Sequence, residues 1–361
     1  MAKSLLVTGA AGFIGANFVH YWAAAHPEDT LVAYDALTYA GNKASLASLL
    51  QLPNFHFVHA DIRDYDQVLA TMREYRVDTV VHFAAESHVD RSISGPDAFI
   101  DTNVVGTHSM LKAAREYWLV EGQLAQHRFH HVSTDEVYGS LSPEAPGFHE
   151  QQKYEPNSPY SASKAASDHL VRAYLHTYGL QVTTSNCSNN YGPYHFPEKL
   201  IPLCLTNILR GLPLPVYGDG SNIRDWLYVD DHCSGIDAVL QGGTPGEVYN
   251  IGGINEWYNI DIVRLICARL DELQPGAAPY ADQITYVTDR PGHDRRYAID
   301  ASRMQAELGW LPAHDFESGI EQTIRWYLDN RDWCDRVRSG EYRDYYTVSY
   351  THLTLPTTSA L

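Results

Sequence analysis

The fold of this chain is decided by the stretch TGAAGFIG, Thr8 to Gly15. The apolar residues before it read as a β-strand, and the pattern from Phe13 onward reads as a helix. Gly9 and Gly12 therefore lie in a strand-to-helix turn, the context that makes a glycine pattern informative. Small residues there let the backbone approach a pyrophosphate, whose charge is met by N–H groups at the helix start. The stretch predicts a dinucleotide-binding unit.

Apolar β-type runs alternate with longer helical patterns on the C-terminal side of this turn. Helices are expected to begin at Phe13 and Tyr65, and a third is expected over residues 97–117. The alternation predicts an α/β fold with a Rossmann-type doubly wound parallel sheet that is buried on both faces. The strand candidates are SLLVT, LVAYD, FHFVHAD, VDTVVHFAA and FHHVST.

Asp35 ends the second strand candidate, about 20 residues after Gly15. A carboxylate at this position accepts hydrogen bonds from both ribose hydroxyls and repels a 2′-phosphate. The cofactor is therefore predicted to be NAD rather than NADP. The alternative is a glycine turn followed by an ordinary surface aspartate, which the strand–turn–helix context disfavours.

The sequence texture divides the chain into two parts. Residues 1–190 are expected to form the NAD-binding domain, with returning segments near 223–252. Residues 191–345, where loops rich in proline and glycine separate shorter helices, are expected to form mainly a smaller, irregular α/β substrate-binding lobe. Residues 348–361 are threonine-rich and lack a helical period, so we interpret them as a non-native tail.

Composition excludes several classes of protein. The 361 residues carry a formal net charge of −18 at pH 7, which disfavours a nucleic-acid or anionic-membrane surface. The five cysteines form no Cys-x-x-Cys pair, which argues against a zinc site or a disulfide framework. No signal peptide is recognised, and no run approaches about 20 apolar residues. We expect a soluble, cytoplasmic protein without a metal.

Tyr160 and Lys164 are predicted to lie one turn apart on a helix that begins at Ser158-Pro159. Lowering a tyrosine pKa from near 10 to about 7 requires roughly 4 kcal/mol of preferential phenolate stabilisation. A lysine ammonium and a nicotinamide ring would supply it. Taken alone, the pair reads more readily as two exposed side chains. Beside the glycine turn, it predicts acid–base chemistry at a nicotinamide.

Two adjacent carboxylates, Asp135 and Glu136, follow the strand candidate that ends at Thr134. Mutual repulsion in a partly dry pocket favours one of them staying protonated, so the pair can serve as an acid and a base. Neighbouring side chains on a regular strand point to opposite faces, so the backbone must bend after Thr134 for both to reach one substrate. The alternative is a solvated Asp-Glu turn.

At these motifs the chain resembles the extended short-chain dehydrogenase/reductase superfamily. The resemblance is carried by TGAAGFIG, by the Tyr160 to Lys164 pattern and by the upstream hydroxyl residue. Within the superfamily the chain is most similar to the dTDP-glucose 4,6-dehydratases. The segments of this closer resemblance, between about Leu5 and Trp333, are AAESHVDRS, STDEVYG, NCSNNYGPYHFPEKLIP, PLPVYGDG, IRDWLYVDDH, YNIGG and DRPGHDRRYAID.

The resemblance implies a lyase that converts dTDP-glucose to dTDP-4-keto-6-deoxyglucose in deoxysugar biosynthesis, as in the dTDP-rhamnose pathway. Tyr160 would take the proton of the 4-hydroxyl, with Thr134 beside that oxygen, as hydride leaves carbon 4 for NAD. Glu136 would remove the carbon-5 proton, and Asp135 would protonate the departing 6-hydroxyl. Hydride would then return to carbon 6. With Lys164, these five residues form the implied catalytic set.

The same resemblance assigns the residues that contact the two ligands. For the cofactor they are Gly9, Gly12, Phe13, Ile14, Gly15, Asp35, Leu37, Thr38, Asp61, Ile62, Ala84, Ala85, Ser87, Thr102, Tyr160, Lys164 and Asn190. For the nucleotide sugar they are Ser87, Thr134, Asn189, Lys199, Leu200, Pro215, Val216, Tyr217, Arg224, Asn259, Asp289, Arg290 and His293. Arginine suits the diphosphate because its donors lie in one plane, although a structural ion pair is the alternative for Arg224.

Three rival functions remain at this stage. A nucleotide-sugar 4-epimerase would need Tyr160, Lys164 and NAD but no elimination acid and base, so Asp135 and Glu136 disfavour it. A dehydratase could act on GDP-mannose or another nucleotide sugar. A catalytically inactive NAD-binding regulator would not need the five catalytic residues. The resemblance also implies a homodimer through a four-helix interface.

Overall fold

A seven-stranded parallel sheet forms the centre of the molecule in the computed structural model, which describes residues 2–124, 126–289 and 293–338. The strand order is β10-β6-β5-β4-β1-β2-β3. The doubly wound α/β prediction is confirmed, while the tail predicted from residue 348 lies outside the described residues. The strands are β1 Ser4–Thr8, β2 Thr30–Asp35, β3 Phe55–His59, β4 Thr79–His82, β5 Arg128–Thr134, β6 Val182–Cys187 and β10 Val248–Ile251.

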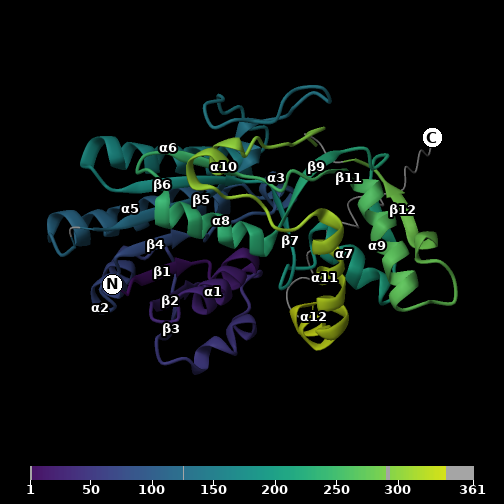
Figure 1. Ribbon diagram of the computed structural model, residues 1–361, viewed down its shortest axis with the longest axis horizontal. Coiled ribbons are helices and arrows are strands. Elements are labelled where there is room, and N and C mark those ends of the chain that lie inside the picture. The colour runs from purple at the N-terminus through teal and green to yellow at the C-terminus, as the bar shows by residue number, and fades with distance from the viewer. Residues whose placement is uncertain (1, 125, 290–292, 339–361) are drawn as a thin grey trace, which may run out of the picture.

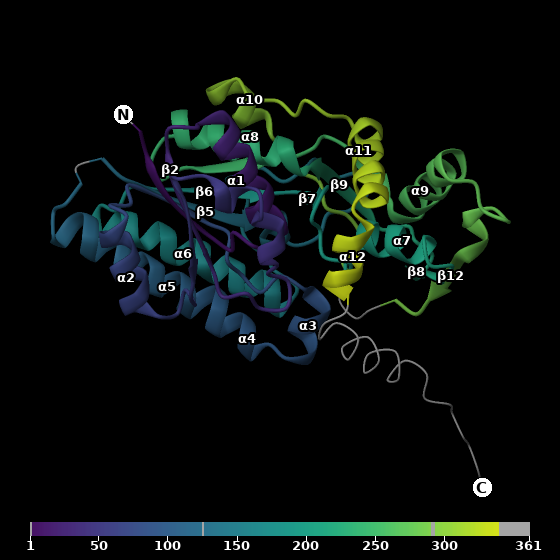
Figure 2. The same ribbon diagram turned by 90° about the horizontal axis from the view of Figure 1, so that it is seen from below.

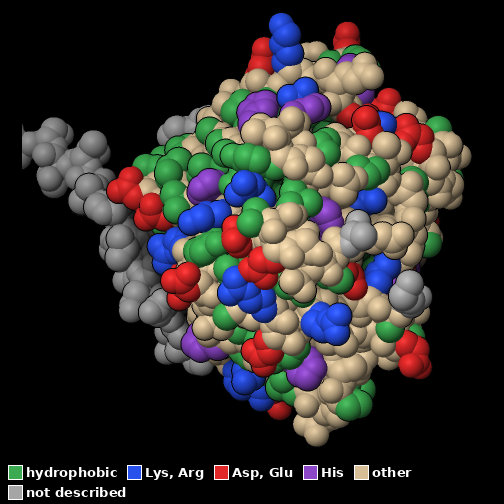
Figure 3. Space-filling model, turned by 90° about the vertical axis from the view of Figure 1, so that its left-hand side faces the viewer, with side chains coloured by type: hydrophobic (Ala, Val, Ile, Leu, Met, Phe, Trp, Pro, Cys, Tyr) green, Lys and Arg blue, Asp and Glu red, His purple; other side chains and the backbone are tan. Residues whose placement is uncertain are grey.

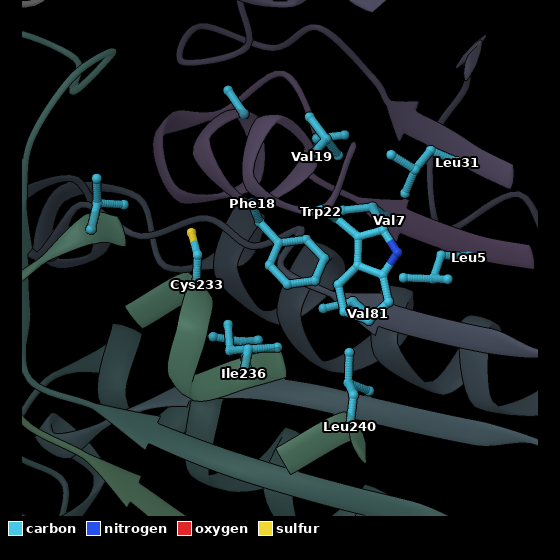
Figure 4. Packing of buried hydrophobic residues seen from close by; sticks show 14 of the residues in the cluster. Leu5, Val7, Phe18, Val19, Trp22, Leu31, Val81, Cys233, Ile236 and Leu240 are labelled. Atoms are coloured by element: carbon cyan, nitrogen blue, oxygen red, sulfur yellow. The ribbon is translucent and has the colours of Figure 1, made fainter. Parts of the chain in front are cut away.

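Helices cover both faces of this sheet (Figure 1, Figure 2). One face carries α1 Phe13–Ala25, α8 Val229–Gly242 and α10 Ser302–Leu308, and the other carries α2 Tyr65–Glu74, α5 Thr107–Arg115 and α6 Pro159–Tyr178. Because strand side chains alternate, Leu5 and Val7 of β1 join the α1 and α8 core, whereas Leu6 joins the opposite core. In Figure 4, Phe18 of α1 and Ile236 of α8 pack in the first of these cores.

The helix predicted over residues 97–117 is interrupted rather than regular. Wide π-helical turns occupy Ile100–Gly106 and Glu116–Val120, on either side of α5, and the short helices α3 Val89–Ser94 and α4 Asp97–Phe99 precede them. The first π segment contains Asn103, whose buried amide must find partners. It bonds both backbone groups of Glu86 and the Ser163 hydroxyl of α6.

A second, smaller lobe lies beside the carboxyl ends of the central strands (Figure 2). Its two small sheets are β7-β9-β11 and β8-β12. Ile201, Ile262 and Ile320, from three different helices, meet in its core. Its elements are β7 Asn189–Tyr191, α7 Leu200–Ile208, β8 Leu214–Tyr217, β9 Ile223–Tyr228, β11 Glu256–Tyr258, α9 Asn259–Leu273, β12 Ile284–Val287, α11 Phe316–Asp329 and α12 Arg331–Arg338. Short 3-10 helices occur at Lys43–Leu46, Leu49–Gln51, Asp135–Tyr138 and Tyr280–Gln283.

The surface carries charges of both signs. On the face drawn in Figure 3, basic and acidic side chains are interspersed with histidine and hydrophobic ones rather than gathered into one basic area. Among the described residues, no helix has the length and apolar character needed to span a bilayer.

Candidate active site

A cavity of roughly 690 Å³ opens at the carboxyl ends of the central strands. Ligands bind at this edge in open parallel sheets because the loops that follow the strands converge there. The glycine turn after β1 and Asp35 at the end of β2 line it, as do Tyr160 on α6 and Arg224 on β9 of the second lobe. Both lobes therefore contribute side chains to one cavity, which we call the site cavity.

The glycine turn is packed so closely that larger residues are excluded. Gly9 has a φ of +68°, and a Cβ there would lie 2.8 Å from the backbone nitrogen of Ala84. A Cβ on Gly15 would overlap the carbonyl oxygen of Gly9. Gly12 is the N-cap of α1, and no side chain there accepts a hydrogen bond from the first N–H groups of the helix. Gly12, Phe13, Ile14 and Gly15 line the site cavity. Such a cradle suits a pyrophosphate.

Asp35 is held in place by two backbone N–H groups. The Ala11 N–H donates to its Oδ2 at 2.9 Å, and the Leu37 N–H donates to its Oδ1 at 2.7 Å. Burial raises the pKa of the Asp35 carboxyl, and these two hydrogen bonds oppose the rise. The carboxylate is thus oriented at the strand end, where two adjacent hydroxyls of a ribose would find its remaining lone pairs.

The backbone bends after Thr134, as the catalytic interpretation of the two carboxylates required. Strand β5 ends at Thr134, and a 3-10 helix begins at Asp135, so Asp135 and Glu136 both line the site cavity. The Thr134 hydroxyl donates to Asp135 Oδ1 at 3.3 Å and accepts from the Glu136 N–H at 3.3 Å. A solvated Asp-Glu turn does not describe this arrangement, because Asp135 is only 2% exposed.

The environments of the two carboxylates differ. Burial and the neighbouring Glu136 charge raise the pKa of Asp135 well above its usual range, and Asp225 adds to the rise. Glu136 is only half-buried. The site can therefore hold Asp135 as a neutral acid while Glu136 carries the charge.

Helix α6 begins as predicted. The Ser158 hydroxyl accepts from the Ser161 N–H, the Ser161 hydroxyl accepts from the Ser158 N–H, and Pro159 occupies the first turn. This capping box sets the start of the helix, so that Tyr160 and Lys164 both reach the site cavity.

The expected lowering of the Tyr160 pKa is not produced by the chain itself. Burial, followed by the negative charge of Glu136, raises the pKa of Tyr160 well above its usual range. The Lys164 ammonium donates to the carbonyl oxygen of Val132 at 2.9 Å, and burial lowers the pKa of Lys164. The prediction counted the charges of Lys164 and of a nicotinamide ring, but not the desolvation of Tyr160 and Lys164, which depends on the tertiary fold.

The second lobe adds polar groups to the other side of the site cavity. Arg224 is 5% exposed, and its guanidinium carbon lies 4.2 Å from the centre of the Tyr297 ring. Lys199 Nζ donates to the Ser87 carbonyl oxygen at 3.1 Å. His293 Nδ1 lies 2.6 Å from Asp289 Oδ1. A diphosphate between Arg224 and Lys199 would meet two positive charges in an otherwise acidic protein.

Most of the predicted contact residues line the site cavity, together with all five predicted catalytic residues. Val216 instead packs in the core of the second lobe, and Leu37 contributes its backbone N–H to Asp35. Arg290 lies outside the described residues. The predicted residues whose side chains are absent from the described lining are Leu37, Pro215, Val216, Tyr217 and Asp289.

Sequence reasoning overlooked Glu198, which also lines the site cavity. It accepts a 3.3 Å hydrogen bond from the Tyr39 hydroxyl and lies 3.8 Å from Arg91 Nε. Burial raises its pKa to about 7. The available signal was its place in the segment FPEKLIP, directly before the predicted substrate residue Lys199.

Metal-binding clusters are absent from the described part of the chain, since no group of three or more His, Cys, Asp or Glu residues is arranged to hold an ion. All five cysteines are buried.

Comparison with known proteins identifies the family. The sequence profile of the GDP-mannose 4,6 dehydratase family matches residues 6–323. A dTDP-glucose 4,6-dehydratase from Xanthomonas campestris pv. campestris is 59% identical over 342 residues, covering 94% of this chain and 97% of the relative.

Comparison with solved structures gives the same family. A dTDP-glucose 4,6-dehydratase from Streptomyces venezuelae, with NAD bound, superimposes with a TM-score of 0.85 at 47% identity, covering 93% of this chain and 100% of the other. A UDP-glucose 4-epimerase from Thermotoga maritima gives a TM-score of 0.80 at 26% identity, covering 91% and 99%. By sequence and by fold, the chain belongs to the dTDP-glucose 4,6-dehydratase family.

Proposed function

We propose that the chain is an NAD-dependent hydro-lyase that converts dTDP-glucose to dTDP-4-keto-6-deoxyglucose. One observation carries the proposal: Thr134, Asp135, Glu136, Tyr160 and Lys164 line the same cavity as the glycine turn. An oxidation site and an elimination acid–base pair thus face one space, as a reaction that oxidises and dehydrates a single sugar requires. The substrate and the cofactor are those of the relatives described above.

The residues of the glycine turn fit NAD. Gly9 and Gly15 leave room where a Cβ would collide, and the Asp35 carboxylate is fixed for ribose hydroxyls. When bound, NAD would accept a hydride from carbon 4 of the hexose and give it back at carbon 6. The remaining chemistry falls to side chains of this chain.

Tyr160 is the base for the 4-hydroxyl proton in this proposal. Its phenol is buried beside Thr134, whose hydroxyl lowers the Tyr160 pKa through a hydrogen bond even though the net shift is upward. The Lys164 ammonium stabilises the phenolate electrostatically. Proton loss at oxygen 4 and hydride loss at carbon 4 together give a 4-keto sugar, which makes the C–H bond at carbon 5 acidic.

Glu136 and Asp135 carry out the elimination. Glu136 removes the carbon-5 proton, and Asp135 gives its proton to the 6-hydroxyl as water departs. The division follows from their surroundings, because a deeply buried carboxyl keeps its proton and a half-exposed one loses it. A proton must then be delivered at carbon 5 when carbon 6 is reduced. Each turnover thus protonates Tyr160 and deprotonates Asp135, and both must be reset.

The test is incubation of the purified protein with NAD and dTDP-glucose, followed by alkali. A 4-keto-6-deoxy sugar develops an ultraviolet absorbance under these conditions, and the starting sugar does not. We expect this absorbance with the natural chain and its loss in Tyr160→Phe, which lacks the hydroxyl that accepts the proton.

Other products would point to the rivals. An epimerase would give a nucleotide sugar of unchanged mass and no alkali-induced absorbance, and an inactive NAD-binding protein would give no product. The family profile that matches this chain is that of the GDP-mannose 4,6 dehydratases. Parallel incubation with GDP-mannose therefore tests whether the protein prefers that substrate. Faster dehydration of GDP-mannose than of dTDP-glucose would overturn the proposed substrate.

We also propose a homodimer in a reducing, cytoplasmic compartment. Ile93, Ile100 and Val105 are each close to half exposed on the segments that pack against α6, where a second copy would cover them. Figure 2 places α3, which carries Ile93, and α4, which directly precedes Ile100, on the same side of the sheet as α5 and α6. Cys187, Cys204, Cys233 and Cys267 are buried thiols outside any disulfide, which supports a reducing compartment.

A further inference from the structure

A second cavity, of roughly 1030 Å³, lies against α6 and the first residues of β6 and β10. It shares no described lining residue with the site cavity. Asp168 lines it, one helical turn beyond Lys164 and two turns beyond Tyr160. This spacing of four residues places all three side chains along one face of α6, so the helix connects the two cavities.

Asp168 is tied to the strand that carries the catalytic carboxylates. The Ser133 hydroxyl donates to Asp168 Oδ2 at 2.9 Å, and Ser133 directly precedes Thr134. His131 Nε2 lies 3.1 Å from Asp168 Oδ1. This contact does not have the geometry of a hydrogen bond, and neither atom has a hydrogen-bond partner among the described residues. The carboxyl is 6% exposed. A carboxylate buried to this degree is costly unless a positive charge offsets it.

Lys164 is a buried positive group one turn before Asp168 on α6, whereas Arg172, one turn after Asp168, is exposed and also lines the second cavity. Burial raises the pKa of Asp168 to about 6, and the charge of Lys164 opposes that rise. Conversely, burial lowers the pKa of Lys164, and the charge of Asp168 opposes that fall. No ion pair joins the two groups directly in the part of the chain described, so each acts on the other through space.

Five further titratable groups beside Asp168 and Lys164 are uncharged at neutral pH, and a sixth, His169, lies at the edge of the pair. Burial holds the pKa of His82 and of His131 well below the usual range, and it raises the pKa of Cys187 to about 12. Tyr138 and Tyr154 have raised pKa values as well. His169, exposed on α6, lowers the pKa of Asp168 slightly. The neighbours that face the pair are therefore His82 on β4, His131 on β5, Tyr138 on the 3-10 helix, Tyr154 in the loop before α6, Cys187 on β6 and His169 on α6.

We propose that Asp168 is a positioning residue that keeps Lys164 charged beside Tyr160, from one turn further along the same face of α6. The consequence for the reaction rests on the proposed function, because only there does the Lys164 charge stabilise a Tyr160 phenolate. Asp168 touches neither reacting atoms nor the site cavity, so it acts through Lys164. Removing its charge should lower the pH at which Lys164 loses its proton and so weaken the phenolate.

Asp168→Asn is the direct test, with Asp168→Glu as the variant that keeps the charge. Glu150→Gln is the matched control, because Glu150 lines the same second cavity and its pKa is raised mainly by burial, against backbone hydrogen bonds and the charge of Arg303. In the dTDP-glucose assay we expect Asp168→Asn to lower kcat about tenfold at pH 8, with KM within about twofold, and to move the alkaline limb of the kcat profile about one pH unit lower. Asp168→Glu and Glu150→Gln should keep the limb in place.

A second readout does not depend on activity. The Asp168 carboxyl has a pKa of about 6 in the folded protein and an ordinary value near 3.8 when unfolded, so its ionisation destabilises the fold as pH rises through this window. Asp168→Asn should therefore gain stability relative to the natural chain between pH 4 and pH 7 in urea unfolding.

The outcomes separate cleanly. An unchanged alkaline limb in Asp168→Asn, or an equal shift in Asp168→Glu, would overturn the positioning role. A pH-independent stability difference would overturn the buried charge itself. If Asp168→Asn does not fold, Asp168→Glu alone decides, since a shifted limb there contradicts the proposal. Failure of the natural chain to dehydrate dTDP-glucose would refute the proposed function while leaving the unfolding comparison valid.

Discussion

Asp135 and Glu136 differ in burial although they are adjacent in the sequence. The strand ends between Thr134 and Asp135, and the following 3-10 helix turns Asp135 inward and leaves Glu136 half-buried. The sequence predicted that the two pKa values would separate, because like charges in a dry pocket cannot both ionise. Which carboxylate keeps its proton depends on burial, and burial is a property of the tertiary fold.

Glu136→Gln tests the division of labour at this scale. Glutamine has the shape of glutamate but cannot take the carbon-5 proton, so oxidation should survive while elimination falls at least about 100-fold. Reduced nicotinamide should then accumulate after addition of dTDP-glucose, measured by its absorbance in a stopped-flow experiment. Glu144→Gln, an exposed change in the same region, is the control. Unimpaired water loss in Glu136→Gln would refute the role of Glu136.

At the scale of elements, the order of strands and helices was predictable and the irregular segments were not. The glycine turn, the Asp35 strand end and the Ser158-Pro159 helix start are local signals, and each appears where it was expected. The π-helical turn around Asn103 depends on partners in two distant segments, which periodicity cannot reveal. The buried Glu198 escaped notice for the same reason.

The N-terminal cap of α6 is predicted to affect both the stability of the protein and its catalytic rate. Ser158→Ala removes the hydroxyl that accepts from the Ser161 N–H, which should lower the free energy of unfolding by about 1 kcal/mol. Because Tyr160 lies in the first turn, looser capping should also lower kcat roughly threefold to tenfold, with little change in KM.

Urea unfolding and steady-state assays measure the two effects of this change. Ser158→Asp, which restores a capping oxygen, should recover most of the lost stability. Equal stability of Ser158→Ala and the natural chain would show that the capping box does not secure this end of the helix.

At the scale of the whole molecule, buried neutral histidines should make the fold sensitive to acid. His130 is fully buried between the Thr183 and Ser185 hydroxyls, and burial holds its pKa well below the usual 6.5. Below pH 6.5 the unfolded chain binds a proton that the folded chain does not, so stability falls as pH drops.

His130→Gln removes this proton linkage. Relative to the variant, the natural chain should lose about 2 kcal/mol of stability between pH 7 and pH 5. Urea unfolding of both proteins at the two pH values measures this difference, and carboxyls common to both proteins cancel from it. A difference that is the same at pH 5 and pH 7 would mean that the folded protein binds this proton as readily as the unfolded chain does, which contradicts a lowered His130 pKa.

The proposed dimer gives the last whole-molecule prediction. Ile100 and Val105 are each 48% exposed on the π-helical segment that packs against α6, and charging both would place two carboxylates per copy in an apolar interface. The Ile100→Glu/Val105→Glu variant should sediment as a monomer at concentrations where the natural chain sediments as a dimer. Leu311→Glu changes an equally exposed apolar residue in the loop before α11 and should leave the mass unchanged. A dimer that persists in the double variant would place the interface on another surface of the molecule.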